Sequence, residues 1–177
     1  MTKIVESRWD GAMRFTSTDQ TGGVVAQDGT DGETGYRPSA LLLASLAGCT
    51  GMDVISILAK KRQAVQDYRI VVTGDQRPTH PKTFTTIVVE HRFGGSDLDA
   101  EAVQRAIVLS ATRYCPVTAQ LATGDVAITH RFRMDGDTNG TDVVVTGPFG
   151  AGLDPVTDQP SSAVSVSSTV TNPSSPR

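Results

Sequence analysis

The sequence predicts an α+β fold with antiparallel sheet, and three observations lead to that prediction. Segments typical of strands and of helices are grouped along the chain instead of strictly alternating, which favours α+β over a doubly wound parallel sheet. The stretch LLLASLAGCTGMDVISILAKK, residues 41–61, is apolar on nearly every face of a helix, so it must be enclosed all round. Because residues 1–135 hold few aromatic side chains for that cover, we expect a second subunit to help bury the helix.

The first expected elements are three short strands joined by turns, followed by the long helix. Asp10-Gly11 is a hairpin signal, and Pro38 suits the first turn of a helix. The basic run at 60–62 complements the dipole at the helix end. The expected ranges are 3–10, 12–18 and 23–27 for the strands and 38–62 for the helix.

The apolar residues 40–59 are numerous enough to span a bilayer. They include Asp53 and several hydroxyl side chains, which make insertion costly. We therefore predict a buried core helix and no membrane partner.

The second half of the chain is expected to form two strands, an amphipathic helix, a short helix and a last strand. The amphipathic helix carries its apolar residues on one face, together with Ser110. The expected ranges are 68–75 and 83–93 for the strands, 97–113 and 116–122 for the helices, and 126–134 for the last strand.

Charge and composition divide the chain near residue 135. Residues 1–135 carry fifteen basic and fifteen acidic side chains, which argues against a nucleic-acid partner, since that needs clustered positive charge. Residues 136–177 carry the whole net charge of −3, and thirteen of these forty-two residues are Ser or Thr. Such a stretch buries too little surface to fold. We predict one domain over 1–135 and a disordered low-complexity tail over 136–177.

Two cysteines, Cys49 and Cys115, are the candidate reactive groups, and so few thiols in an ordinary composition indicate a reducing, cytoplasmic compartment. Cys49 belongs to a polar stripe along the apolar helix, flanked by Gly48 and Gly51. Such a stripe can line a pocket, or it can be a close helix crossing in which Cys49 only packs. The stripe consists of Ser45, Cys49, Asp53 and Ser56.

The two thiols differ in how readily they would ionise. Asp53, one helical turn after Cys49, disfavours a thiolate by repulsion of like charges, so a reactive Cys49 needs a nearby cation. Cys115 precedes Pro116, which suits a helix start, where the helix dipole favours a thiolate. The candidate cations are Arg14, Arg37 and Arg113.

Two segments together resemble a known family. RPSALLLASLAGCTGMDVISILAKKR, residues 37–62, and LSATRYCPVTAQL, residues 109–121, are similar to the cysteine-bearing segments of the OsmC/Ohr family of thiol-dependent peroxidases. The first of them, with HPKTFTTIVVEHRF at 80–93, looks like the YhfA-like branch. The resemblance covers roughly residues 3–134.

This resemblance implies an OsmC-like fold, an intertwined homodimer in which antiparallel sheets wrap around two long central helices. It implies that Cys49 is the peroxidatic nucleophile, that Cys115 resolves it as a disulfide, and that Arg14 supports the thiolate. The substrate would be an organic hydroperoxide, and the chemistry would serve the oxidative stress response. An external dithiol, such as a dihydrolipoyl protein, would reduce the disulfide, and no cofactor would be needed.

One position departs from the family pattern. The family has Pro-Glu ten residues before the first cysteine, where this chain has Pro38-Ser39, and the shifted version would place Glu at Ala40. The arginine then lacks its orienting carboxylate unless Glu33 or Asp53 replaces it. A second hypothesis is therefore a family member without efficient peroxidase activity that binds a small hydrophobic molecule or senses redox state. A third is a structural dimer with inert thiols.

Other candidate sites in the sequence are weak. His80, His91 and His130 show no metal-ligand spacing, and we expect the last two on the surface or on a sheet face. The segment DGDTNGTDVVVT, residues 135–146, begins like a calcium loop, but Thr146 stands where such a loop has its bidentate glutamate. A turn is the better interpretation, and we expect no metal.

Overall fold

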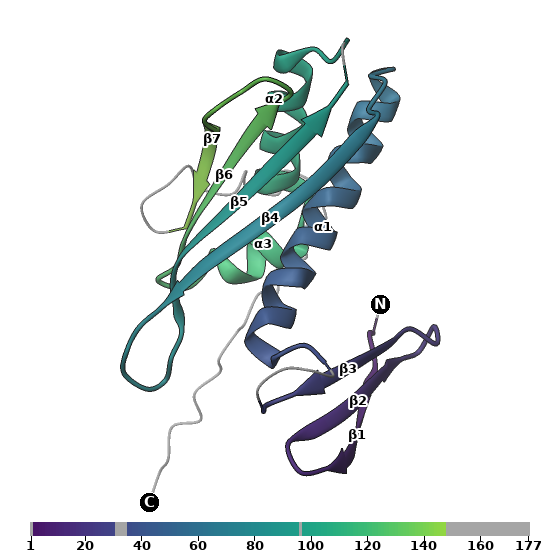
Figure 1. Ribbon diagram of the computed structural model, residues 1–177, viewed down its shortest axis with the longest axis vertical. Helices are drawn as coiled ribbons and strands as arrows, with labels where there is room; N and C mark the ends of the chain where they lie inside the picture. Colours follow the sequence, from purple (N-terminus) through teal and green to yellow (C-terminus); the bar gives the residue numbers. More distant parts are fainter. Residues whose placement is uncertain (1, 31–34, 96, 148–177) are drawn as a thin grey trace, which may run out of the picture.

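The computed structural model describes residues 2–30, 35–95 and 97–147, and in these ranges the chain forms a mixed α+β fold, as predicted. Two sheets and one long helix dominate the fold (Figure 1). The elements are β1 (Val5–Gly11), β2 (Arg14–Asp19), β3 (Val24–Asp28), α1 (Pro38–Lys60), β4 (Asp67–Gln76), β5 (Phe84–Gly94), α2 (Ala100–Leu109), the π-helical turn η1 (Ser110–Tyr114), α3 (Pro116–Leu121), β6 (Ala127–Met134) and β7 (Thr141–Thr146).

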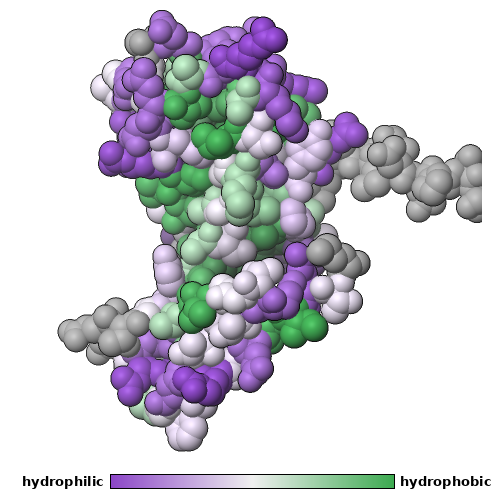
Figure 2. Space-filling model, turned by 90° about the vertical axis from the view of Figure 1, so that its right-hand side faces the viewer, coloured by the Kyte–Doolittle hydropathy of each residue, from purple (hydrophilic) through white to green (hydrophobic). Residues whose placement is uncertain are grey.

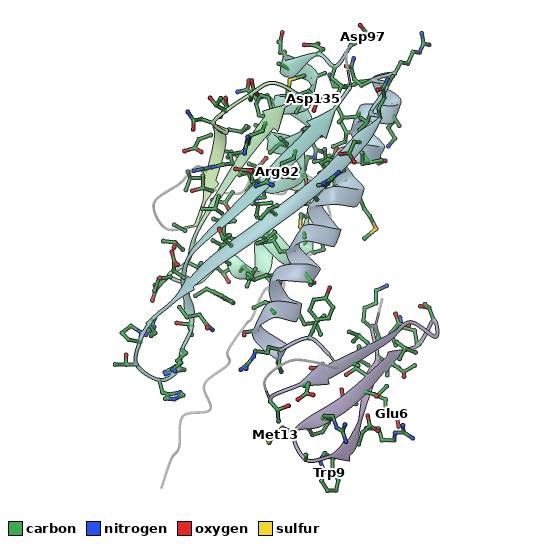
Figure 3. The ribbon with its side chains drawn as sticks, viewed as in Figure 1. Glu6, Trp9, Met13, Arg92, Asp97 and Asp135 are labelled. Carbon is green, nitrogen blue, oxygen red and sulfur yellow. The ribbon has the colours of Figure 1, made fainter. Side chains whose placement is uncertain are left out.

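The first sheet stands apart from the rest of the chain, beyond the N-terminal end of α1 (Figure 1). Its strands pair antiparallel in the order β1-β2-β3. The first turn falls at Ala12 and Met13, two residues after the predicted Asp10-Gly11, because Gly11 continues β1 and pairs with Arg14. Among its strand residues only Ser17 and Asp28 are buried, whereas Trp9 is exposed and points away from the rest of the chain (Figure 3). This sheet therefore has no apolar core of its own within one chain.

The second sheet has the strand order β4-β5-β6-β7 and is mixed. β4 pairs antiparallel with β5 and β6 with β7, but β5 and β6 run parallel. The prediction of wholly antiparallel sheets is wrong at this pair. The reason is the connection, because α2, η1 and α3 lie between β5 and β6 and form a crossover long enough to bring the chain back in the same direction.

The buried side of α1 packs along β4 and against the helices that cover the second sheet (Figure 1). Leu46, Val54 and Leu58 are fully buried there, and each such side chain contributes roughly 1.5–3 kcal/mol by leaving water. Gly51 allows the close approach of β4, because a Cβ at this position would lie 2.6 Å from Ile70 Cδ1. The helix and the second sheet thus share one core.

The opposite side of α1 is uncovered within one chain. Met52 is 72% exposed and Leu42 is 40% exposed, and Figure 2 shows hydrophobic residues gathered across the narrow middle of this side of the molecule. By length and composition α1 could cross a membrane, a test that core helices of soluble proteins also pass. One chain therefore supplies only part of the enclosure that this apolar helix requires.

Two predicted boundaries are wrong. A single helix is expected over 97–113, but α2 begins at Ala100 after the cap Asp99, whose carboxylate accepts the N–H of Glu101, and it gives way to η1 at Ser110. The domain is expected to end at residue 135, but β7 completes the sheet beside β6, because its β-branched residues pair despite the Ser/Thr-rich composition around them. The rest of the expected tail, residues 148–177, lies outside the described residues.

Candidate functional site

The structure brings Cys49 and Cys115 together, although they lie far apart in the sequence. Their two sulfur atoms and a carboxylate oxygen of Asp53 all lie within 4.8 Å of one another. Both cysteines are free thiols; Cys115 is buried and Cys49 is half-buried. Cys49 is therefore the more accessible thiol of the pair.

The π-helical turn η1 positions Cys115. The N–H of Cys115 donates to the carbonyl of Ser110 at 2.9 Å. This bond joins residues five apart, as in a π turn, and π turns are frequent at functional sites. Pro116 disfavours a helical conformation in the residue before it, so Cys115 is extended and caps α3. The sulfur of Cys115 accepts a hydrogen bond from the N–H of Thr118 at 3.3 Å.

A buried hydroxyl network holds Asp53 beside the thiols. Ser110 Oγ donates to Asp53 Oδ2 at 3.0 Å, and Ser110 Oγ lies 3.0 Å from Thr50 Oγ1. Ser110 and Thr50 are both fully buried, so this carboxylate oxygen is fixed in orientation. The sequence does not reveal this role of Ser110 and Thr50, since hydroxyl residues among apolar ones also occur as plain packing.

The surroundings of Cys49 disfavour its ionisation. Burial, as the largest cause, raises the pKa of the Cys49 thiol to about 12. The neighbouring Cys115 and the charge of Asp53 raise this pKa further, and the N–H of Val117 lowers it. None of these groups is a cation, so within one chain Cys49 is a protonated thiol at neutral pH.

None of the three candidate arginines has a contact with the thiols among those that the structure gives for the described residues of one chain. Arg14 is on β2, in the separate first sheet (Figure 1). Arg37 precedes α1, and at the rise of an α-helix its Cα lies about 18 Å from that of Cys49. Arg113 is exposed, with its guanidinium 5.8 Å from the centre of the Tyr114 ring. The structure thus joins the two predicted cysteines but does not bring Arg14 to them.

Among the described residues, the first turn of α1 does not restore the carboxylate that the family pattern places there, but the buried Asp28 stands opposite Arg14 in the β2–β3 pair. Ser39 and Ala40 are exposed in the first helical turn, which contains no acidic residue. Asp53 faces the thiols and accepts the bond from Ser110, so it lies beside the cysteines and not at the start of the helix. Glu33 lies outside the described residues.

A cavity of about 640 Å³ opens beside the N-terminal end of α1. This volume is within the usual range for small-molecule sites. Several residues of its wall also belong to the apolar cluster that contains Cys115 and against which Cys49 packs. The lining includes Leu42, Phe84, Leu121 and Val126, together with the cations Arg77 and Lys82.

The remaining candidates from the sequence are structural. His91 and His130 are fully buried on the face of the second sheet that carries its core, so the surface alternative is wrong and the sheet-face alternative holds. Asp135 and Asp137 accept backbone N–H bonds from Gly95 and Met134. Figure 3 shows Asp135 at the end of the sheet near α2. Both carboxylates thus hold backbone in turns.

The long helix with its cysteine, the second cysteine on the crossover and the mixed sheet together define a class of protein. A family model described as OsmC-like protein matches residues 29–131, and the chain belongs to this family.

Individual relatives agree with this assignment. Protein YhfA of Escherichia coli (strain K12) is 35% identical over 127 residues, which are 72% of this chain and 94% of YhfA. The crystal structure of a protein from Aquifex aeolicus VF5 is 31% identical with a TM-score of 0.66, covering 76% of this chain and 98% of that one. The organic hydroperoxide resistance protein OhrB of Bacillus subtilis shares the fold at 21% identity and a TM-score of 0.53, covering 75% of this chain and 98% of its own.

Proposed function

We propose that this protein is a cysteine-based peroxidase that reduces organic hydroperoxides and serves the oxidative stress response. The observation that carries the proposal is the approach of the Cys49 and Cys115 sulfur atoms to within 4.8 Å in an apolar surrounding. Small rotations of the two side chains would bring these sulfurs to bonding distance. Membership of the OsmC-like family and the fold shared with an organic hydroperoxide resistance protein support the same activity.

The roles of the two cysteines follow from their exposure. Cys49 is the more accessible thiol, so its thiolate attacks the terminal oxygen of the hydroperoxide, the O–O bond breaks, the alcohol leaves and a sulfenic acid forms. Cys115, held by the N–H of Thr118, then attacks this sulfur and releases water, which leaves a disulfide. An external dithiol, for example on a dihydrolipoyl protein, restores both thiols by exchange.

A thiolate at Cys49 requires a cation that one chain does not place there. We propose that Arg14 of a second subunit supplies it in a homodimer. The uncovered apolar side of α1, with Met52 and Leu42, and the detached first sheet that carries Arg14 both support this assembly. In it, each first sheet would pack against the long helix of the other subunit.

The test is to treat the reduced protein with cumene hydroperoxide and then to measure mass and free thiols. We expect each chain to lose two hydrogen atoms and both thiols, and Cys49→Ser to abolish this loss. Thiols that survive excess hydroperoxide in the native protein but react after denaturation would refute the peroxidase and indicate inert, structural cysteines.

The cavity beside α1 favours a second candidate function, the binding of a small hydrophobic molecule. Phe84, Leu121 and Val126 give it an apolar wall, and Arg77 with Lys82 adds positive charge. An amphipathic molecule with an acidic group matches this combination. The raised pKa of Cys49 supports this candidate, because a protonated thiol is a poor peroxidatic nucleophile.

Fluorescent fatty acids distinguish this candidate. A binding module would take them up with no change in its free thiols, and Leu42→Arg, which places charge in the apolar wall, would weaken the uptake. Gln104→Arg, on an exposed position of α2, is the matched control. Equal uptake by both variants would place the binding elsewhere.

A further inference from the structure

The reduced site has the donor set of a metal centre. We propose that Cys49, Cys115 and Asp53 bind one Zn²⁺ ion when both cysteines are reduced, and that this ion protects the two thiols from oxidation. The inference rests on the proposed function, because it concerns the regulation of the same pair of thiols. The sequence alone does not suggest this site, since only the fold joins Cys115 to the other two residues.

The distances suit a tetrahedral ion. Zinc binds thiolate sulfur at about 2.3 Å and carboxylate oxygen at about 2.0–2.2 Å, so the donor atoms around one ion lie about 3.6–3.8 Å apart. The three donor atoms here lie within 4.8 Å of one another without any ion. A side-chain rotation of either half-buried residue, Cys49 or Asp53, closes the difference. Three protein ligands leave a fourth position open for water.

Hydrogen bonds from neighbouring groups also orient the donor atoms, as is usual for metal ligands. Ser110 donates to Asp53 Oδ2 at 3.0 Å, which leaves the other lone pairs of the carboxylate free for an ion. The Ser110 hydroxyl is itself 3.0 Å from Thr50 Oγ1, and both hydroxyls are fully buried. The N–H of Thr118 fixes the sulfur of Cys115 at 3.3 Å.

The charges of the site call for a cation. With both thiols ionised, the three donors would carry three negative charges in a partly buried place. A divalent ion offsets these charges, and a coordinating thiol is deprotonated outright. Two soft thiolates select zinc over magnesium or calcium, which prefer oxygen donors.

Zinc binding and oxidation exclude each other. Formation of the site releases two protons from the thiols. A hydroperoxide that oxidises the zinc-bound pair takes two electrons from the two thiolates and two protons from solvent, giving one disulfide, one alcohol and one water. The disulfide has no thiolate to donate, so the Zn²⁺ ion leaves. Bound zinc therefore slows thiol oxidation, and oxidation frees the ion.

The experiment uses the reduced, metal-free full-length protein and Co²⁺ as a spectroscopic probe. We expect a thiolate-to-cobalt charge-transfer band that saturates at one ion per chain, is displaced by Zn²⁺, and is absent from the disulfide form. Cys49→Ser and Cys115→Ser should each remove the band. Asp53→Asn should weaken Zn²⁺ binding at least about tenfold, while the control Asp125→Asn, at an exposed position, should bind as the unmodified protein does.

The outcomes separate this inference from the peroxidase. Lack of the charge-transfer band, or equal zinc affinity of the Asp53→Asn and Asp125→Asn proteins, overturns the zinc site. Loss of both thiols to hydroperoxide is measured separately in the presence of a chelator. Thiol loss without zinc binding supports the peroxidase and refutes the zinc site. Zinc binding without thiol loss supports the zinc site and refutes the peroxidase. Circular dichroism of each variant confirms that it is folded.

Discussion

At the scale of single residues, Asp53 affects the pKa of the Cys49 thiol, and a substitution can test its effect. Its charge is one of the causes that raise the pKa of Cys49, although burial is the largest. A carboxylate one turn from a nucleophilic thiol opposes thiolate formation unless a cation offsets it. The same residue therefore restrains peroxidase chemistry and favours a bound metal.

Replacing this carboxylate should activate the thiol. Asp53→Asn removes the repulsion between charges, so the pKa of Cys49 falls and its alkylation by iodoacetamide at a given pH accelerates by a few fold, with burial still limiting it. The measurement is the alkylation rate against pH in the presence of chelator. Asp67→Asn, at an exposed ion pair with Arg69, is the control and should change nothing. An unchanged pH profile in Asp53→Asn would mean that the carboxylate does not act on Cys49.

The hydroxyl that orients Asp53 should matter for stability. Ser110→Ala leaves Thr50 Oγ1 and a carboxylate oxygen without their buried partner, which costs about 1–3 kcal/mol of the free energy of unfolding. Urea denaturation measures this loss. Ser56→Ala, at an exposed position of α1, should stay within about 0.5 kcal/mol. Equal effects of both substitutions would contradict the assigned role of the network.

The sequence predicts part of this site and misses the rest for a physical reason. The spacing of Cys49 and Asp53 on a helix places them on one stripe, so their proximity can be read from the sequence. The position of Ser110 depends on η1, and the sequence of this turn has no periodicity that distinguishes a π turn from an α-helix. The place of Arg14 depends on an assembly beyond one chain.

At the scale of elements, β5 and β6 bury two histidines side by side. The rings of His91 and His130 lie 5.9 Å apart, and His91 Nδ1 is 2.7 Å from the Tyr68 hydroxyl. Burial lowers the pKa of His91 to about 3 and that of His130 to about 4, and the neighbouring His130 lowers the former further. Both side chains are thus neutral in the folded protein well below their ordinary pKa.

This pair should make the fold sensitive to acid. The unfolded chain takes up protons near pH 6.5 and the folded chain does not, so stability is full above that pH and falls as the pH drops towards about 4. At pH 5 the loss is about 2 kcal/mol for each histidine. Urea denaturation at pH 7.5 and pH 5 measures it, and His130→Gln should reduce the difference. An equal difference in His130→Gln and in the exposed control His80→Gln would assign the acid sensitivity to other groups.

The parallel pairing of these two strands marks a limit of pattern reading. Alternation and β-branched residues predict that β5 and β6 are strands, and both exist close to the predicted ranges. Direction depends on how far the crossover between them travels, which the local pattern does not encode. The strand β7 is not predicted either, because its formation depends on pairing with β6 and not on the Ser/Thr-rich composition around it.

At the scale of the whole molecule, the apolar long helix predicts a second subunit. Met52 is the most exposed large hydrophobic side chain of α1. Met52→Lys leaves a monomer undisturbed, because the position is open to water, but it buries a charge if another chain covers α1. We expect the protein to sediment as a dimer and the variant to dissociate, with Gln104→Lys as the control. Sedimentation as a monomer at all concentrations, with no effect of the substitution, would refute the homodimer.

The origin of the supporting cation gives the sharpest test of the assembly. If Arg14 acts on the Cys49 of the other subunit, Arg14→Gln and Cys49→Ser are each inactive as pure dimers, but a mixed dimer has one intact site. Unfolding and refolding an equal mixture should then restore hydroperoxide reduction to about a quarter of the unmodified level, since half of the dimers are mixed and each regains one of two sites. An arginine that acts within its own chain allows no such recovery, because the chain with Cys49 still lacks its cation. Refolding each variant alone is the control, and a mixture no more active than these would exclude Arg14 as a group shared between subunits.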